Sequence, residues 1–281
     1  MGPSALRLAG LNARLESLGY EIEDLGNVPV AQQESTPTGP QKAKYLPQIA
    51  KTCAALAGAV HSTVKAGKFP LVLGGDHSVA VGSVAGVAHA YREKREQIGL
   101  IWIDAHADMN TPDSSPSGNI HGMPLACCAG VGPPELVQIF DWAPKVHGRN
   151  IVLLGLRDVD ARERDLVRES GVTAFTMRDI DERGLRSIMA DAIERANDGT
   201  AGFHLSLDMD VVDPDEAPGV GTPVRGGITY REAHLAMETI CDCTRMLSME
   251  IVEVNPVLDE ANRTALLGVE LVMSAMGKKI L

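Results

Sequence analysis

Short apolar runs rich in β-branched residues alternate along the chain with longer amphipathic segments. This alternation is typical of repeated β-α units, which form a parallel sheet with helices packed on both faces. The predicted strands are 20–24, 70–73, 99–104, 151–154, 172–175, 203–208 and 249–254. The predicted helices are 3–18, 43–65, 79–96, 161–170, 185–196, 230–243 and 260–276. Because the sequence contains no repeat, low-complexity tract or interdomain linker, it predicts a single three-layer α/β/α domain over residues 1–281 with a mostly parallel central sheet.

Composition narrows the class of protein. Hydrophobic residues make up 44% of the chain and charged residues 22%, which favours a soluble globular enzyme over a disordered chain. No apolar run reaches the roughly 18–20 residues that a membrane helix needs, and the first residues lack the pattern of a secretion signal. The formal net charge of −11 argues against a nucleic-acid partner. We therefore predict a cytoplasmic protein with neither a nucleic-acid nor a membrane partner.

The cysteines do not suggest a disulfide framework. There are five, an odd number, and no two of them form a C-x-x-C pair. Buried free thiols are therefore expected at Cys53, Cys127, Cys128, Cys241 and Cys243.

Acidic and histidine residues gather where apolar strands are predicted to end. Four stretches share this pattern, namely 71–77, 101–108, 205–210 and 250–253. In open parallel sheets, ligands bind outside the carboxyl ends of the strands. These four stretches are therefore expected to meet at one site.

The residue types at these ends predict a metal centre. In Asp104-x-His106-x-Asp108, strand alternation would point all three side chains to one side. Asp208-x-Asp210 repeats the pattern on a second strand, and His77 adds an imidazole from a third. Two divalent cations would balance the four carboxylates, whose burial without counter-charge would be expensive.

Ligand chemistry favours manganese over zinc, because the set is rich in carboxylates and contains no cysteine. Taken singly, each motif has an ordinary interpretation. A D-x-H-x-D sequence is more often a turn, and His77 could be a buried histidine with satisfied hydrogen bonds. The metal hypothesis depends on their combination at successive strand ends.

Three stretches resemble the signature motifs of the ureohydrolases, the family that includes arginase, agmatinase and formimidoylglutamase. They are Gly74-Gly75-Asp76-His77-Ser78, the segment 102–108 (WIDAHAD) and the segment 206–214 (SLDMDVVDP). The similarity covers nearly the whole chain, and the motifs occur in family order. The resemblance implies manganese-dependent hydrolysis of L-arginine to L-ornithine and urea, with a hydroxide between two Mn²⁺ ions as the nucleophile.

The resemblance also implies a ligand set. His77, Asp104, Asp108 and Asp208 would bind one Mn²⁺, while His106, Asp104, Asp208 and Asp210 would bind the other. Asp104 and Asp208 would bridge the two ions, and Asp108 would also hydrogen-bond the hydroxide.

Substrate residues follow from the same resemblance, because the segment 110–122 is similar to the arginase loop that recognises the α-carboxylate. The residues expected to contact the carboxylate are Asn110, Ser115, Ser117 and Asn119. Asp160 would bind the α-amino group with help from Glu163, and Glu253 would pair with the guanidinium. His121 would act as a proton shuttle to the leaving amine. Thr222 is expected near the same pocket.

Alternatives stay open at this point. Serine and asparagine in a loop are usually turn formers, and Asp160 could simply cap the following helix. The nearest rival activity is hydrolysis of agmatine or another guanidino acid, and a non-catalytic, metal-stabilised binding protein is a rival of another class. His61, His89, His147, His204 and His234 match no family site and are expected to be surface or core residues. Family analogy suggests a homotrimer or homohexamer.

The amino end departs from the family pattern. Family members usually begin with a β-strand and a glycine-rich turn before a Gly-Pro-Ser-Ala-Leu-Arg segment, whereas here Met1 directly precedes Gly2-Pro3. The first family strand is therefore expected to be missing, through a start assigned too far downstream or a truncation.

Overall fold

A six-stranded parallel sheet forms the centre of the structure, a computed structural model that describes residues 1–279. The strands are β1 (Leu71–Leu73), β2 (Gly99–Ile103), β3 (Ile151–Leu156), β4 (Thr173–Thr176), β5 (Phe203–Asp208) and β6 (Met246–Val252). Their order is β1-β6-β5-β2-β3-β4, and every neighbouring pair runs parallel. The predicted α/β class with a parallel sheet is confirmed.

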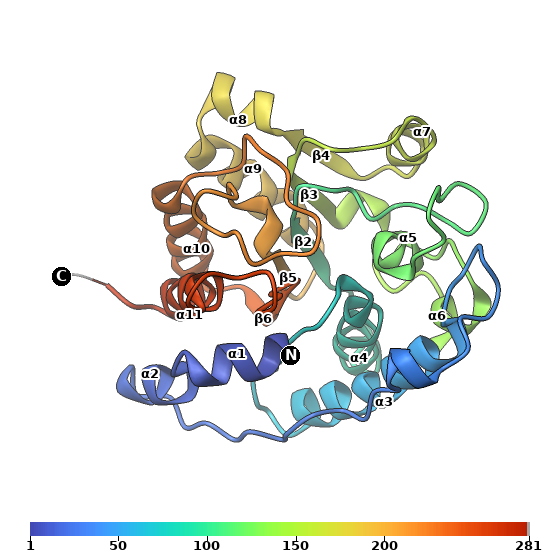
Figure 1. Ribbon diagram of the computed structural model, residues 1–281. Coiled ribbons are helices and arrows are strands. Elements are labelled where there is room, and N and C mark those ends of the chain that lie inside the picture. The colour runs from blue at the N-terminus through green and yellow to red at the C-terminus, as the bar shows by residue number, and fades with distance from the viewer. Residues whose placement is uncertain (280–281) are drawn as a thin grey trace.

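Alternation along each strand sends apolar side chains to both faces of the sheet. In β2, Ile101 and Ile103 belong to one core, whereas Leu100 and Trp102 belong to the other. Helices α1 (Gly2–Leu8), α2 (Leu11–Ser17), α9 (Leu185–Asn197), α10 (Tyr230–Cys243) and α11 (Arg263–Ala275) cover the first face. On the other face lie α3 (Leu46–Lys65), α4 (Ala80–Arg92) and α5 (Pro124–Cys128). Figure 1 shows these two helical layers with the sheet between them.

Three short helices were not predicted, namely α5, α6 (Pro134–Val137) and α8 (Met177–Arg183). The remaining helix, α7 (Ala161–Glu169), matches its prediction. The single helix predicted over 3–18 is wrong, since Gly10 adopts a left-handed conformation (φ 86°) and separates α1 from α2. Glycine reaches this conformation without steric cost, so the chain turns there.

The strand predicted at 20–24 is also wrong. Residues 20–32 form no helix or strand, and within residues 1–279 no strand pairs with the outer edge of β1. A strand needs a neighbour for its backbone groups, and this segment is held by side chains instead. The Arg7 guanidinium donates to both carboxylate oxygens of Asp24 at 2.7 and 2.9 Å, and the Tyr20 hydroxyl donates to the Met276 carbonyl at 2.8 Å.

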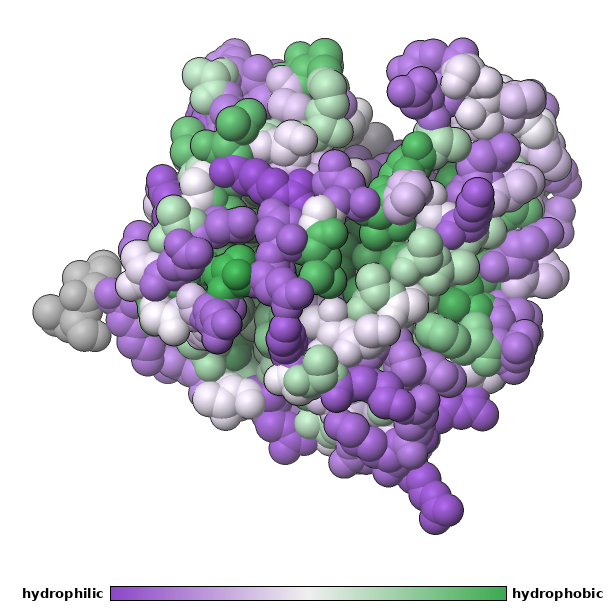
Figure 2. Space-filling view, turned by 90° about the horizontal axis from the view of Figure 1, so that it is seen from below, coloured by the Kyte–Doolittle hydropathy of each residue, from purple (hydrophilic) through white to green (hydrophobic). Residues whose placement is uncertain are grey.

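All five cysteines are free, as predicted, but only Cys53, Cys127 and Cys128 are buried; Cys241 and Cys243 are half-buried. Among the described residues, no helix combines the length and apolar character needed to cross a membrane. Hydrophilic residues surround the lower edge of the face in Figure 2, with hydrophobic residues interspersed nearer its middle.

Candidate metal centre and adjoining cavity

The segment after β2 carries three of the predicted ligands, but strand alternation does not explain how their side chains converge. The strand ends at Ile103, and Asp104 then accepts a hydrogen bond from the His106 backbone N–H at 2.7 Å, which turns the chain. Asp108 adopts a left-handed conformation with φ 50°. The three side chains do converge as predicted, but a strained turn rather than an extended strand brings them together.

The end of β5 is built in a similar way. Asp208 accepts a hydrogen bond from the Asp210 backbone N–H at 2.8 Å at the start of the 3₁₀ turn Met209–Val211. Asp210 in turn accepts from the Ala105 N–H at 3.2 Å, which joins this turn to the end of β2. The turns therefore fix one another as well as the carboxylates.

His77 comes from a glycine-rich turn after β1. A Cβ at Gly74 would lie 2.6 Å from the Val252 side chain, so only glycine allows this close approach to β6. The His77 ring stacks on Trp102 with centroids 4.0 Å apart, and its Nε2 lies 2.7 Å from Ser206 Oγ. Both contacts aim Nδ1 of His77 into the cluster.

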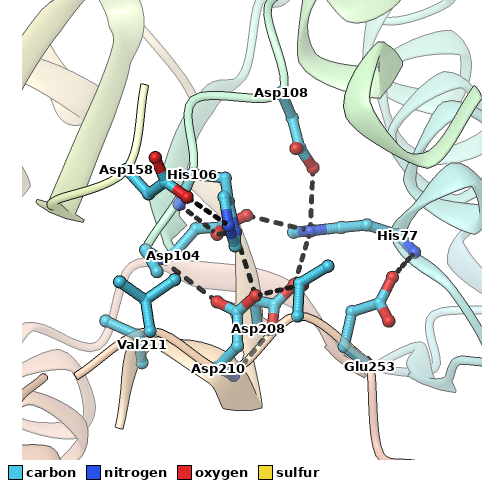
Figure 3. A network of polar contacts seen from close by, with 12 residues as sticks. His77, Asp104, His106, Asp108, Asp158, Asp208, Asp210, Val211 and Glu253 are labelled. Carbon is cyan, nitrogen blue, oxygen red and sulfur yellow. Dashed lines mark hydrogen bonds and ion pairs between the residues drawn. The ribbon is translucent and has the colours of Figure 1, made fainter. Parts of the chain in front are cut away.

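Close polar contacts connect the six predicted ligands into one cluster (Figure 3). His77 Nδ1 is 3.1 Å from Asp104 Oδ2, 3.1 Å from Asp108 Oδ2 and 3.0 Å from Asp208 Oδ2. His106 Nδ1 is 3.0 Å from Asp210 Oδ2 and 3.4 Å from Asp104 Oδ1. Ligands that surround one ion at about 2.1 Å are themselves about 3.0–3.4 Å apart. These spacings therefore fit two adjoining cation sites that share Asp104.

An unsatisfied atom supports the same interpretation. Within residues 1–279, His77 Nδ1 makes no hydrogen bond, although three carboxylate oxygens surround it. One imidazole nitrogen cannot donate to three acceptors, whereas a cation accepts electron pairs from all four atoms. The donor set of carboxylates and imidazoles thus fits divalent ions.

The buried carboxylates of the cluster would also be stabilised by bound positive charge. All four aspartates are at most 6% exposed. Burial, and then the charges of Asp210 and Asp104, raise the pKa of Asp208 well above its usual value. Burial and the Asp104 charge likewise raise the pKa of Asp108 to about 6. Four buried carboxylates are costly to ionise together, and cations would remove that cost.

A cavity of about 250 Å³ opens beside the cluster. Predicted residues that line it are His77, His106, Asp108, Asn110, His121, Asp160, Glu163, Asp208, Asp210, Thr222 and Glu253. Pro116, Gly122 and Asp158 also line it and were not predicted. The sixth predicted ligand, Asp104, is buried and is not among the lining residues. One cavity thus brings together the metal-ligand cluster and most of the expected substrate residues.

Three residues predicted to contact the α-carboxylate, Ser115, Ser117 and Asn119, do not line this cavity. Ser115 Oγ accepts a hydrogen bond from the Gly118 N–H at 2.9 Å, and Ser117 Oγ accepts one from the Asn119 N–H at 3.1 Å. The two hydroxyls therefore act as turn formers here, which was the alternative interpretation of this loop.

The whole chain matches known proteins of one family. The model of the Arginase family matches residues 1–277. The chain belongs to this family. It is 49% identical over 282 residues to the arginase of Bacillus caldovelox, covering 100% of this chain and 93% of that protein, and 47% identical to that of Bacillus subtilis with the same coverage.

Solved arginase structures share the fold. The native arginase of Bacillus caldovelox superposes with a TM-score of 0.95 at 48% identity, covering 100% of this chain and 93% of that one. The Entamoeba histolytica arginase in complex with L-ornithine gives 0.89 at 30% identity, covering 99% and 91%. The chain is therefore a hydrolase of the arginase family, and the suspected ureohydrolase resemblance is confirmed.

Among the residues that line the cavity, Asp160 has the structural role that was weighed against substrate binding. Its carboxylate caps α7 by accepting from the N–H groups of Arg162 and Glu163 at 3.0 and 3.1 Å. Its second oxygen accepts from Asn110 Nδ2 at 3.0 Å. Glu163 accepts from the Met109 N–H at 2.9 Å, and burial raises its pKa to about 7.

Glu253, another residue that lines the cavity, connects several parts of the site. It adopts a left-handed conformation (φ 62°), and its Oε1 accepts from the His77 N–H at 2.8 Å. The same oxygen lies 3.5 Å from His121 Nδ1. This contact with Glu253 raises the pKa of His121 to about 9, so the imidazole carries a proton at neutral pH. Thr222 Oγ1 donates to Asp210 Oδ2 at 3.0 Å.

Behind the cluster is a buried group that sequence reasoning missed. Glu250 is fully buried in β6 and accepts from Ser206 Oγ at 2.7 Å, while that hydroxyl also contacts His77. Glu250 therefore positions His77, a candidate metal ligand, through the Ser206 hydroxyl. The available signal was a carboxylate inside an apolar strand, because a buried charge requires partners.

Proposed function

We propose that this arginase-family hydrolase splits the guanidinium group of L-arginine, with two Mn²⁺ ions, into L-ornithine and urea. The observation that carries the proposal is the position of Glu253. This carboxylate lines a small cavity that is also lined by five of the six proposed metal ligands. The known arginases of similar sequence support the same substrate.

The proposed ligands are His77, Asp104, Asp108 and Asp208 for one ion and His106, Asp104, Asp208 and Asp210 for the other. Bound there, two divalent ions would supply a water of lowered pKa as the nucleophile. Manganese suits the oxygen-rich donor set.

Several side chains of the chain itself would bind and orient the substrate. Glu253 would accept hydrogen bonds from the guanidinium NH groups, which pair well with carboxylates. The protonated His121 lies beside Glu253, where it can release its proton to the amine that leaves as ornithine. Asp108 would accept a hydrogen bond from the attacking water.

The outer rim would select an amino acid over a simple amine. Asp160 would pair with the α-amino group, with Glu163 close by. Asn110, Ser115, Ser117 and Asn119 would supply neutral donors to the α-carboxylate, which requires the two serines to reorient from their turn contacts. The complex of the Entamoeba histolytica arginase with L-ornithine supports an amino-acid product.

The decisive test is urea release from L-arginine and from agmatine by the manganese-loaded protein. Arginine should be the better substrate, and a preference for agmatine would overturn the substrate assignment. Asp160→Asn keeps an N-cap acceptor but removes the charge. It should raise KM for both substrates, because agmatine lacks the α-carboxylate but keeps the amine that Asp160 would bind. An unchanged KM for both substrates would mean that Asp160 only caps α7.

The cytoplasmic location predicted from the sequence and the homotrimer or homohexamer suggested by family analogy both stay predictions. Light scattering coupled to size-exclusion chromatography tests the assembly, and a monomer or dimer in solution would contradict it.

A further inference from the structure

A second group of metal-type side chains lies on the surface formed by α3 and α4, outside the cavity. It consists of His61 on α3, His89 on α4 and Glu93 at the end of α4; we call it the helix cluster. One ligand atom from each residue lies within 4.8 Å of the other two. His61 and His89 were expected only to be surface or core residues, and this proximity could not be foreseen from their spacing.

Two glycines bring these helices together. Added Cβ atoms at Gly82 and Gly86 of α4 would lie 2.6 Å from the carbonyl oxygens of Cys53 and Ala57 on α3. Only residues without a side chain allow helices to approach so closely. As a result, His61 and His89 face each other with ring centroids 4.9 Å apart.

The spacing of the donor atoms fits a single ion. His61 Nε2 is 3.3 Å from Glu93 Oε1, and His89 Nε2 is 3.8 Å from the same oxygen. For a tetrahedral ion bound at about 2.0–2.1 Å, adjacent ligand atoms are about 3.3 Å apart. Small side-chain rotations would bring all three atoms into range, since His89 and Glu93 are one helical turn apart on one face.

The surroundings fix the orientation of the His89 ring. It stacks on Phe140, with centroids 4.1 Å apart and an angle of 6°. Glu93, in turn, is a carboxylate at a helix carboxyl end, where the helix dipole favours cations.

We propose that His61 Nε2, His89 Nε2 and Glu93 Oε1 form a binding site for a divalent transition ion of the zinc class. Two imidazoles and one carboxylate are a donor set that such ions favour over magnesium or calcium. The remaining coordination position would face solvent. A bound ion would link α3 to α4 and so add stability rather than take part in hydrolysis.

The competing occupant is a lysine of the chain itself. Lys65 Nζ lies 2.9 Å from Glu93 Oε2 and already balances part of the carboxylate charge. It leaves Oε1 on the side of the histidines, so both partners can use Glu93 at once. The ammonium nevertheless repels a second cation, which makes zinc binding weaker than at a site without a neighbouring lysine.

Equilibrium dialysis of the manganese-loaded protein against Zn²⁺ tests the proposal. Four proteins should be compared: wild type, His61→Gln, His89→Gln and His147→Gln. His147 is an exposed histidine outside the cluster and serves as the matched control. Wild type and the control should bind one more zinc per chain than either cluster variant. Any zinc that exchanges into the catalytic centre should add equally to all four proteins. Equal zinc content in all four proteins would overturn the proposal.

A gain-of-affinity variant guards against misfolding of the glutamine variants. Lys65→Met removes the competing ammonium and should tighten zinc binding at the cluster by about tenfold. Unchanged or weaker affinity in a folded Lys65→Met protein would contradict the site. Anomalous diffraction at the zinc edge should place the ion between α3 and α4, and a peak only in the catalytic cavity would also refute it.

Discussion

The proposed catalytic cluster at the ends of β1, β2 and β5 and the helix cluster on α3 and α4 use the same side-chain types in different surroundings. The catalytic cluster consists of His77, Asp104, His106, Asp108, Asp208 and Asp210. In the catalytic cluster, carboxylates outnumber imidazoles and lie at most 6% exposed. In the helix cluster, two half-buried imidazoles share one carboxylate that is 40% exposed and paired with Lys65. Burial therefore makes cations necessary at the first cluster, whereas exposure makes them optional at the second.

The two clusters also differ in how the chain builds them. Turns at strand ends hold the catalytic ligands, and backbone hydrogen bonds such as Ala105 N–H to Asp210 connect the turns. Helix packing alone brings His61 to His89. A site fixed by backbone contacts tolerates little change, while a site fixed by packing of two helices depends on a few small residues.

The largest contrast should come from one isosteric change in each cluster. Asp208→Asn removes a central carboxylate charge and should lower arginine hydrolysis at least about a thousandfold, equivalent to about 4 kcal/mol of transition-state stabilisation. Glu93→Gln should leave activity within about twofold of wild type. Urea release and manganese content measured on both proteins check this prediction. Retention of full activity by Asp208→Asn would remove the distinction between the clusters.

Metal removal should act mainly through the catalytic cluster. Dialysis against a chelator should lower the free energy of unfolding by several kcal/mol, because buried carboxylates lose their counter-charge. Manganese should restore both stability and activity. Thermal unfolding of the chelated and reloaded protein measures the effect, and an unchanged Tm after complete metal removal would contradict it.

In the metal-free protein, the stability contributed by the two clusters should change with pH in opposite directions. Burial lowers the pKa of His106, but hydrogen bonds to Asp104 and Asp210 outweigh it and raise that pKa to about 12. The folded protein then binds more protons than the unfolded chain above about pH 6.5, so this stabilisation decreases as pH rises from 6.5. The pKa of His89 is lowered instead. The folded protein therefore binds fewer protons at His89 than the unfolded chain does, so stability decreases as pH falls below about 6.5.

Denaturant unfolding of the chelated protein between pH 5 and 9, compared with the same series for His89→Gln, measures both effects. The wild type should become less stable than the variant only on the acid side. A larger gap at high pH would reverse the sign assigned to His89.

A methyl group added between α3 and α4 should disturb the helix cluster but not the catalytic cluster, at an intermediate cost in folding stability. In Gly86→Ala, the new Cβ would meet the Ala57 carbonyl at 2.6 Å and Val60 Cβ at 2.8 Å. Pushing the helices apart should cost about 1–3 kcal/mol of stability. It should weaken zinc binding at the helix cluster but leave manganese content unchanged. Loss of manganese in this variant would show that the two clusters are mechanically linked.

The sequence predicts the catalytic cluster far better than the helix cluster, for a physical reason. Each half of the catalytic cluster lies within a few residues of a strand end, and parallel strands bring those ends together whatever the details of packing. His61 and Glu93 are separated by 32 positions, and only the approach of α3 to α4 makes them neighbours. The Gly82-x-x-x-Gly86 spacing was visible in the sequence, but it does not say which helix packs there.

Other errors have the same origin. The strand predicted at 20–24 has the right residue pattern, but pairing depends on neighbours that local pattern does not encode. The assignment of Ser115 and Ser117 to the substrate stays a prediction of the resemblance, and the local hydrogen bonds that their hydroxyls accept from the loop backbone could not be read from the family motif. Alternation was a sound rule for β2, yet it failed after Ile103 because side-chain hydrogen bonds turn the chain.

The smallest expected effect uses another glycine of α3 as the counterpart to Gly86. A Cβ at Gly58 would meet nothing within 4 Å, and its backbone is helical. Gly58→Ala should therefore stabilise the protein by up to about 1 kcal/mol, because alanine loses less backbone entropy in a helix. Denaturant unfolding measures the change, while zinc and manganese content should equal those of wild type. If Gly58→Ala were as destabilising as Gly86→Ala, helix flexibility rather than close contact would explain both, and the account of how His61 meets His89 would fail.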